Sequence, residues 1–252
     1  MENKLHGCKF NRQEKPMILG FDTESARLVP SNRHLINTVG LTCAGFAWRM
    51  PDGVATATIP TITDGEAYKP ELEQEEANDI LTILEGSERF YTWGGMNFDM
   101  QILATVSEQR ERTIKLALGE KHWDLHLLFI ATNGHFLSLG KAAENLGLKK
   151  GTADIKSGAL APQMWADGRY QEVLRYLTND ALMTLLVGEH LSELGHITWN
   201  TKGGRENVWT PSDSLSVLHW HPEALYDFEW EPSPKWVKTP VDKNNFYDWI
   251  NR

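Results

Sequence analysis

Hydrophobic and polar positions along the first third of the chain predict strands joined by short turns. The apolar run at 17–22 ends in a carboxylate and predicts a buried central strand. Residues 38–48 and 54–60 are also strand-like, and the turn signal Pro51-Asp52-Gly53 lies between them. These three segments predict an antiparallel meander.

The next segment changes to a helical period. An acidic helix is expected over 70–85 and a short apolar-aromatic strand over 89–93. Residues 99–118 predict helical structure with a break around Ser107, and Gly119 stops it.

Helices dominate the remainder of this region. Residues 122–130 are expected to begin as a strand and continue as a helix. Ser138 is a candidate N-cap for a helix through 146, closed by Gly147. The longest predicted helix covers 171–194 and has an apolar side. This order predicts an α/β fold, with a mixed central sheet and helices on both faces.

The pattern changes after residue 195. We predict one domain over 1–195 and a Trp/Pro-rich C-terminal extension over 196–252, packed on the domain. The extension has six of the ten tryptophans, with six basic and eight acidic residues. Its aromatic residues could stack unpaired bases, pack against the domain or hold a protein partner. The negative charge favours packing.

Composition is that of a globular protein, with 41% hydrophobic and 23% charged residues among 252. No apolar run reaches the ~18 residues needed to span a bilayer, and the first residues lack the apolar core of a signal peptide. Two cysteines allow no disulfide framework, which predicts a cytoplasmic protein. The net charge of −9 weighs against general nucleic-acid binding but does not exclude a nuclease, whose metal-binding carboxylates contribute to that charge.

Three segments carry acidic residues in informative places. Asp22 and Glu24 are two apart at a predicted strand end, so they share a face and could bind one metal ion. Solvated acids at a strand end are the alternative. Asp99 begins a predicted helix, where an acidic residue also interacts favourably with the helix dipole.

Tyr176 and Asp180 are four residues apart and share one face of the longest predicted helix. Asp180 interrupts an apolar stripe, and a buried carboxylate needs a partner. No basic residue lies three or four positions from it in either direction. A metal ion is therefore favoured over a local salt bridge, although a distant Lys or Arg is an alternative.

Together these segments resemble the DnaQ-like 3′–5′ exonucleases of the DEDD superfamily, which have a ribonuclease H-like fold. The three motifs of that family are matched by Asp22-Thr23-Glu24, by Phe98-Asp99, and by Tyr176 with Asp180. Arg175 occupies the position of the histidine found in a sister branch, so the resemblance is to the tyrosine branch.

The resemblance covers roughly residues 17–195. The motifs are separated by about 75 and about 80 residues, and the segments around 123–125 and 137–148 are similar to exonuclease domains related to those of family-B DNA polymerases. Gly94 stands where many relatives have asparagine, and Asn97 is in a different register. Asp124 is either a carboxylate behind the metal ligands or a helix cap.

The resemblance implies two Mg²⁺ or Mn²⁺ ions, about 3.5–4 Å apart. Asp22 would bridge both ions, and Glu24 and Asp180 would complete one site. Asp99 would hold the second ion, through water. Tyr176 would orient the attacking water or help to deprotonate it, and its ordinary pKa near 10 favours orientation.

Substrate contacts are predicted at five residues. The backbone of Thr23 could meet the terminal nucleotide, and Met96 and Phe98 are candidate wedges against the last bases, with core packing as the alternative. Lys149 and Lys150 could touch the phosphate backbone, or belong to a solvated helix end.

The sequence therefore predicts a metal-dependent 3′–5′ exonuclease acting on 3′ ends of single-stranded nucleic acid, with DNA favoured over RNA. The alternatives are a non-catalytic ribonuclease H-like module that binds nucleic acid or a partner, and a structure-selective endonuclease. A protein partner would bind through the extension, and no membrane association is expected.

Overall fold

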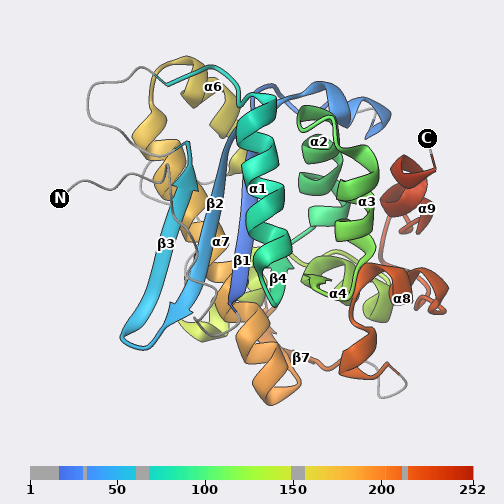
Figure 1. The fold of residues 1–252 in the computed structure, drawn as a ribbon. Coiled ribbons are helices and arrows are strands. Elements are labelled where there is room, and N and C mark those ends of the chain that lie inside the picture. Colours follow the sequence, from blue (N-terminus) through green and yellow to red (C-terminus); the bar gives the residue numbers. More distant parts are fainter. Residues whose placement is uncertain are drawn as a thin grey trace.

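The computed structural model describes residues 17–30, 33–60, 68–148, 157–201, 203–211 and 215–251. A five-stranded sheet lies at its centre, in the order β3-β2-β1-β4-β5 (Figure 1). Its strands are β1 (Ile18–Ser25), β2 (Leu41–Met50), β3 (Gly53–Ile59), β4 (Arg89–Thr92) and β5 (His122–Asp124).

The sheet is mixed, because its two halves are built differently. β1, β2 and β3 pair antiparallel, which confirms the predicted meander. β1, β4 and β5 pair parallel, with Gly20 opposite Tyr91 and Tyr91 opposite Trp123. The carboxyl ends of three parallel strands therefore meet at one edge of the sheet, where Asp22, Glu24 and Asp124 lie.

Helices cover both faces, as expected. Figure 1 shows α1 crossing one side of the sheet, with α7 on the other side. The longer helices are α1 (Gln74–Gly86), α2 (Asp99–Val106), α3 (Arg110–Leu118), α4 (Leu125–Asn133) and α7 (Tyr170–Leu194). The fold is α/β and consistent with a ribonuclease H-like fold. No helix of the described residues is long and apolar enough to span a bilayer.

Local sequence accounts for several helix ends. The backbone N–H of Glu73 donates to the Glu76 carboxylate, 2.7 Å away, at the start of α1. The predicted break near Ser107 separates α2 from α3. Gly195 ends α7 with a φ of 72°.

The helix expected over 138–146 is instead two short pieces. Ser138 caps α5 (Leu139–Ala142) as predicted, its hydroxyl accepting a hydrogen bond from the Lys141 N–H. A separate 3₁₀ turn, Glu144–Leu146, follows and ends at Gly147 with a φ of 73°. The Glu144 carboxylate accepts hydrogen bonds from Lys141 and from the Asn200 N–H, so contact with the next segment accompanies the break.

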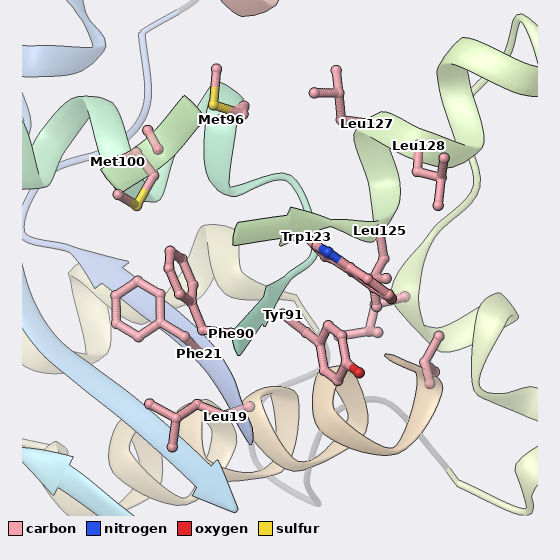
Figure 2. Packing of buried hydrophobic residues seen from close by; sticks show 14 of the residues in the cluster. Leu19, Phe21, Phe90, Tyr91, Met96, Met100, Trp123, Leu125, Leu127 and Leu128 are labelled. Atoms are coloured by element: carbon pink, nitrogen blue, oxygen red, sulfur yellow. The ribbon is translucent and has the colours of Figure 1, made fainter. Parts of the chain in front are cut away.

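The chain after residue 195 shares the main hydrophobic core. It contains a two-stranded ribbon and two short helices: β6 (Ile197–Asn200), β7 (Glu206–Trp209), α8 (Pro222–Asp227) and α9 (Asn244–Tyr247). Trp199, Trp209 and Trp220 are buried in the cluster that also holds Leu19 and Phe90. Figure 2 shows part of this core, with Leu19 and Phe90 among its side chains.

Candidate active site

Two glycines bring α7 against the face of the sheet from which Asp22 and Glu24 project. Gly20, Asp22 and Glu24 alternate along β1 and so share one face. A Cβ atom at Gly20 would lie 2.2 Å from the carbonyl oxygen of Ala181, so the helix backbone packs directly on this strand. Gly45, paired with Asp22, leaves room in the same way for Leu177 of α7.

Helix α7 supplies the other two members of the predicted group. Tyr176 and Asp180 lie one turn apart and are both buried, with 3% of Asp180 exposed. The Tyr176 hydroxyl donates a hydrogen bond to the Asp180 carboxylate. This bond fixes the phenol against the acid.

A third segment approaches the same place. Gly158 begins a 3₁₀ turn (Gly158–Leu160) that lies immediately before helix α6 (Ala161–Ala166). A Cβ atom at Gly158 would lie 3.6 Å from the Tyr176 hydroxyl oxygen and 3.7 Å from each carboxylate oxygen of Glu24. The carboxylate and the phenol therefore come together at one point beside the Gly158 backbone.

The charges of these residues act on one another. Burial raises the pKa of the Tyr176 phenol, and the charges of Asp180, Glu24 and Asp22 raise it further. Burial also raises the pKa of the Cys43 thiol, with smaller contributions from Glu24 and Asp22. Both groups stay protonated at neutral pH, inside a region of concentrated negative charge.

Asp99 lies beside β1 and is bound to Thr23. The Thr23 hydroxyl donates a short hydrogen bond to Oδ1 of Asp99, and both side chains are buried. Burial raises the pKa of Asp99 to about 7; the Thr23 hydroxyl opposes this shift and the charge of Asp124 adds to it. Thr23 points to the face opposite Asp22 and Glu24, so Asp99 is held by the middle residue of the first motif.

Asp124 fixes the turn that leads to Asp99. It caps α4, its Oδ1 accepting from the N–H groups of His126 and Leu127 at 3.1 and 3.0 Å. The same carboxylate accepts from the N–H groups of Gly94, at 2.9 Å, and Met96, at 2.8 Å. A helix cap was one of its two predicted roles. Its hold on the turn between β4 and α2 could not be predicted from spacing.

The remaining predicted residues occupy different surroundings. Met96 is fully buried in the main core, which is the packing alternative, and Phe98 is partly buried against that core. Lys149 and Lys150 lie outside the described residues. Gly158 and Cys43 are the site residues that the sequence analysis missed. Cys43 lies opposite Glu24 on the neighbouring strand β2. No local sequence pattern marks Gly158 as part of the site.

Carboxylate oxygens are the donors that Mg²⁺ and Mn²⁺ prefer, so the chemistry of Asp22, Glu24 and Asp180 fits such an ion. Two of the three are buried, with 6% of Glu24 exposed, and all three act on Tyr176. Within the described ranges, no three His, Cys, Asp or Glu side chains already form a closed metal-binding group. The side chains would have to adjust to close around an ion.

Comparison with known proteins gives a structural match. No protein-family model matches the chain, and no curated protein matches it. Among solved structures, the chain is similar to the family B DNA polymerase from the hyperthermophilic archaeon Pyrobaculum calidifontis, with a TM-score of 0.50 and 14% sequence identity. The match covers 71% of this chain and 25% of that one. At this identity the similarity shows the fold, and this chain corresponds to about a quarter of the polymerase.

Proposed function

We propose that this protein is a metal-dependent 3′–5′ exonuclease of the tyrosine branch, with a ribonuclease H-like fold. Its substrate is single-stranded nucleic acid, DNA in preference to RNA. The observation that carries the proposal is the meeting of Asp22, Glu24, Tyr176 and Asp180 where β1 and α7 cross. The exonuclease domain of a family B polymerase is the part that this chain would correspond to.

Asp22, Glu24 and Asp180 would hold one divalent ion, and Asp22 with Asp99 a second. Mg²⁺ or Mn²⁺ at such a site supplies charge neutralisation of the phosphate and a lowered pKa for bound water. The protein's own carboxylates would fix where the phosphate can lie. Occupation of the second position would compete with the bond between Asp99 and Thr23.

Tyr176 acts as a hydrogen-bond donor in this mechanism. Its raised pKa excludes a phenolate at neutral pH, so it cannot serve as the general base. The phenol O–H already points to Asp180, and the same group can orient a water molecule or a phosphate oxygen. Gly158 contributes no side chain of its own to the space beside the phenol and Glu24, which a Cβ atom at this position would approach to 3.6–3.7 Å.

The test uses single-stranded DNA and RNA of one sequence, labelled at the 5′ end, with Mg²⁺ or Mn²⁺. Expected is a ladder that shortens from the 3′ end, stronger on DNA, and absent with chelator or in Asp22→Asn. Thermal melting of the variant checks that it is folded. A circular single strand has no end, so it should survive; its cleavage would indicate an endonuclease.

Absence of cleavage by folded wild-type protein on both substrates and with both metals would refute the proposal. Binding without cleavage under those conditions would identify the non-catalytic module instead. The Asp22→Asn control also separates activity of this site from a contaminating nuclease.

A further inference from the structure

Two groups of aromatic rings lie between the turn after β4 and the C-terminal segment, and they meet at the neighbouring residues His135 and Phe136. We call them together the aromatic surface; it consists of Trp93, His126 and Phe136 in one group, and His135 and Trp236 in the other. Trp93 and His126 are stacked, with ring centres 5.4 Å apart and planes inclined by 16°. His126 contacts Phe136 at 5.6 Å, and His135 contacts Trp236 at 5.0 Å.

Two of these rings are largely exposed although they are the kind of side chain usually buried. Phe136 is 57% exposed and Trp236 is 70% exposed, while the other three are partly buried. The partly buried rings hold the two exposed rings in place, and the exposed rings leave their faces accessible to a ligand.

Packing holds the C-terminal part of the aromatic surface in place. The Glu231 N–H donates to the carbonyl oxygen of Ala131 at 2.8 Å, which joins the tail to α4. A Cβ atom at Gly134 would lie 2.4 Å from the carbonyl oxygen of Pro232, so the tail backbone lies directly on this residue. Gly134 has a φ of 67° and ends α4, immediately before His135.

The other end of the aromatic surface adjoins the carboxylate site. β1 and β4 are parallel with Gly20 opposite Tyr91, and Trp93 directly follows the carboxyl end of β4, at the sheet edge where Asp22 lies. Oδ1 of Asp124 accepts hydrogen bonds from both the Gly94 and the His126 N–H groups. The buried Asp124 carboxylate thus connects the start of the aromatic surface to the turn that leads to Asp99. In open α/β sheets this edge is where ligands bind.

Charge at the far end favours a phosphate-bearing ligand. Lys235 and Lys238 are both exposed and flank Trp236, in a chain with a net charge of −9. The acidic residues nearest to them in the sequence are Glu231 and Asp242, each four positions from the nearer lysine. Aromatic rings with neighbouring cations are the combination by which proteins bind unpaired strands without sequence preference.

We propose that the aromatic surface binds the unpaired bases of a single strand whose end lies at the carboxylate site, with Lys235 and Lys238 contacting its phosphates. The proposal rests on the proposed function for the direction of the strand, and it gives the C-terminal segment a role in binding substrate. A protein segment is the competing occupant, and the experiment below distinguishes it.

The test measures binding, which does not require cleavage. A fluorescein-labelled 12-nucleotide thymidine strand is titrated with full-length protein in chelator, and Kd is read from fluorescence anisotropy. Phe136→Ala and Trp236→Ala are each expected to weaken binding about tenfold, as loss of base stacking does. Leu218→Ala is the matched control, because Leu218 is 75% exposed and lies outside the surface. Its Kd should equal that of wild type.

Two further arms identify the contacts. Wild-type protein should bind an abasic strand of equal length more weakly than the thymidine strand. On the abasic strand, Phe136→Ala and Trp236→Ala should have the same Kd as wild type. The double variant Lys235→Gln, Lys238→Gln should reduce the slope of log K against log salt by about 1.4, because each single-strand phosphate contact contributes about 0.7.

Equal Kd values for wild type and both aromatic variants would overturn the proposal, as would equal losses on the base-bearing and abasic strands. Failure of wild type to bind any strand would also overturn it and leave a protein as the occupant. These results are independent of cleavage. Cleavage with unaffected variants would refute only this inference, whereas stacking without cleavage would refute only the proposed activity.

Discussion

Replacing Asp99 by asparagine should stabilise the metal-free protein while abolishing its activity. Burial raises the pKa of Asp99 to about 7, so at neutral pH the fold bears the cost of a buried charge. An asparagine of similar shape keeps an oxygen for the Thr23 hydroxyl and carries no charge. Activity should be lost because the amide is a poor ligand for a second ion.

The stability gained by Asp99→Asn over wild type should increase as pH rises. A carboxyl whose pKa is higher in the folded than in the unfolded state keeps a proton that the unfolded chain has lost. Stability therefore falls as pH rises from about 4 to about 7. At about 1.4 kcal/mol per pKa unit, the upper limit of the cost is about 4 kcal/mol at pH 8 and about 2 kcal/mol at pH 5.

Thermal melting in chelator measures this difference. For a protein of this size 1 kcal/mol shifts Tm by about 2–4 °C, so the gain of Asp99→Asn over wild type should be about 4–8 °C larger at pH 8 than at pH 5. Asp52→Asn, at an exposed turn, is the matched control and should show no such difference. A variant destabilised equally at both pH values would show that Asp99 is not a buried charge in the folded protein.

Three other substitutions test the packing and the phenol. Gly20→Ala should destabilise the fold by about 1–3 kcal/mol, because its Cβ atom would meet the α7 backbone. Gly86→Ala is the control and should not destabilise the fold, because a Cβ atom there would have nothing within 4 Å. Denaturant unfolding measures both free energies of unfolding. Gly158→Ala should retain cleavage and Gly158→Val should lose most of it with unchanged Tm, since only the larger side chain enters the space beside Tyr176; equal activities would contradict this. Tyr176→Phe should lower kcat at least about tenfold without changing the shape of the pH–rate profile, because the phenol never ionises in that range; loss of a limb would indicate a general base.

Much of the fold could be predicted because its elements are locally encoded. The run ending at Asp22, the turn at Pro51-Asp52-Gly53 and the apolar side of α7 each have one dominant pattern. The 138–146 segment differs because contacts with Asn200, far along the chain, accompany the break of the expected helix. The ribbon and short helices after 195 have little periodicity, and their structure depends on aromatic packing in the shared core.

The site could be predicted in composition but not in arrangement. Spacing alone put Asp22 with Glu24, and Tyr176 with Asp180, and the structure has each pair on one face. The two pairs are brought together by the close approach of α7 to the sheet at Gly20 and Gly45. A glycine in an apolar strand indicates a close contact, but it does not indicate which segment makes that contact. The bond from Thr23 to Asp99 was not foreseen, because it joins residues 76 positions apart.

The carboxylates also explain how an acidic chain could bind a polyanion. Burial and the charges of Asp180, Glu24 and Asp22 keep Tyr176 protonated, while burial and the charge of Asp124 raise the pKa of Asp99, so the site is electrostatically unfavourable until cations enter. Such a site gains affinity for phosphate only with bound metal, which localises attraction at the reacting bond. The rest of the strand must then be held by forces that tolerate negative charge. Ring stacking is such a force, and at Trp236 it occurs beside two lysines rather than beside the acidic centre. Metal and aromatic surface would thus contribute separately: salt should weaken the lysine contacts, and chelation should abolish cleavage while leaving stacking intact.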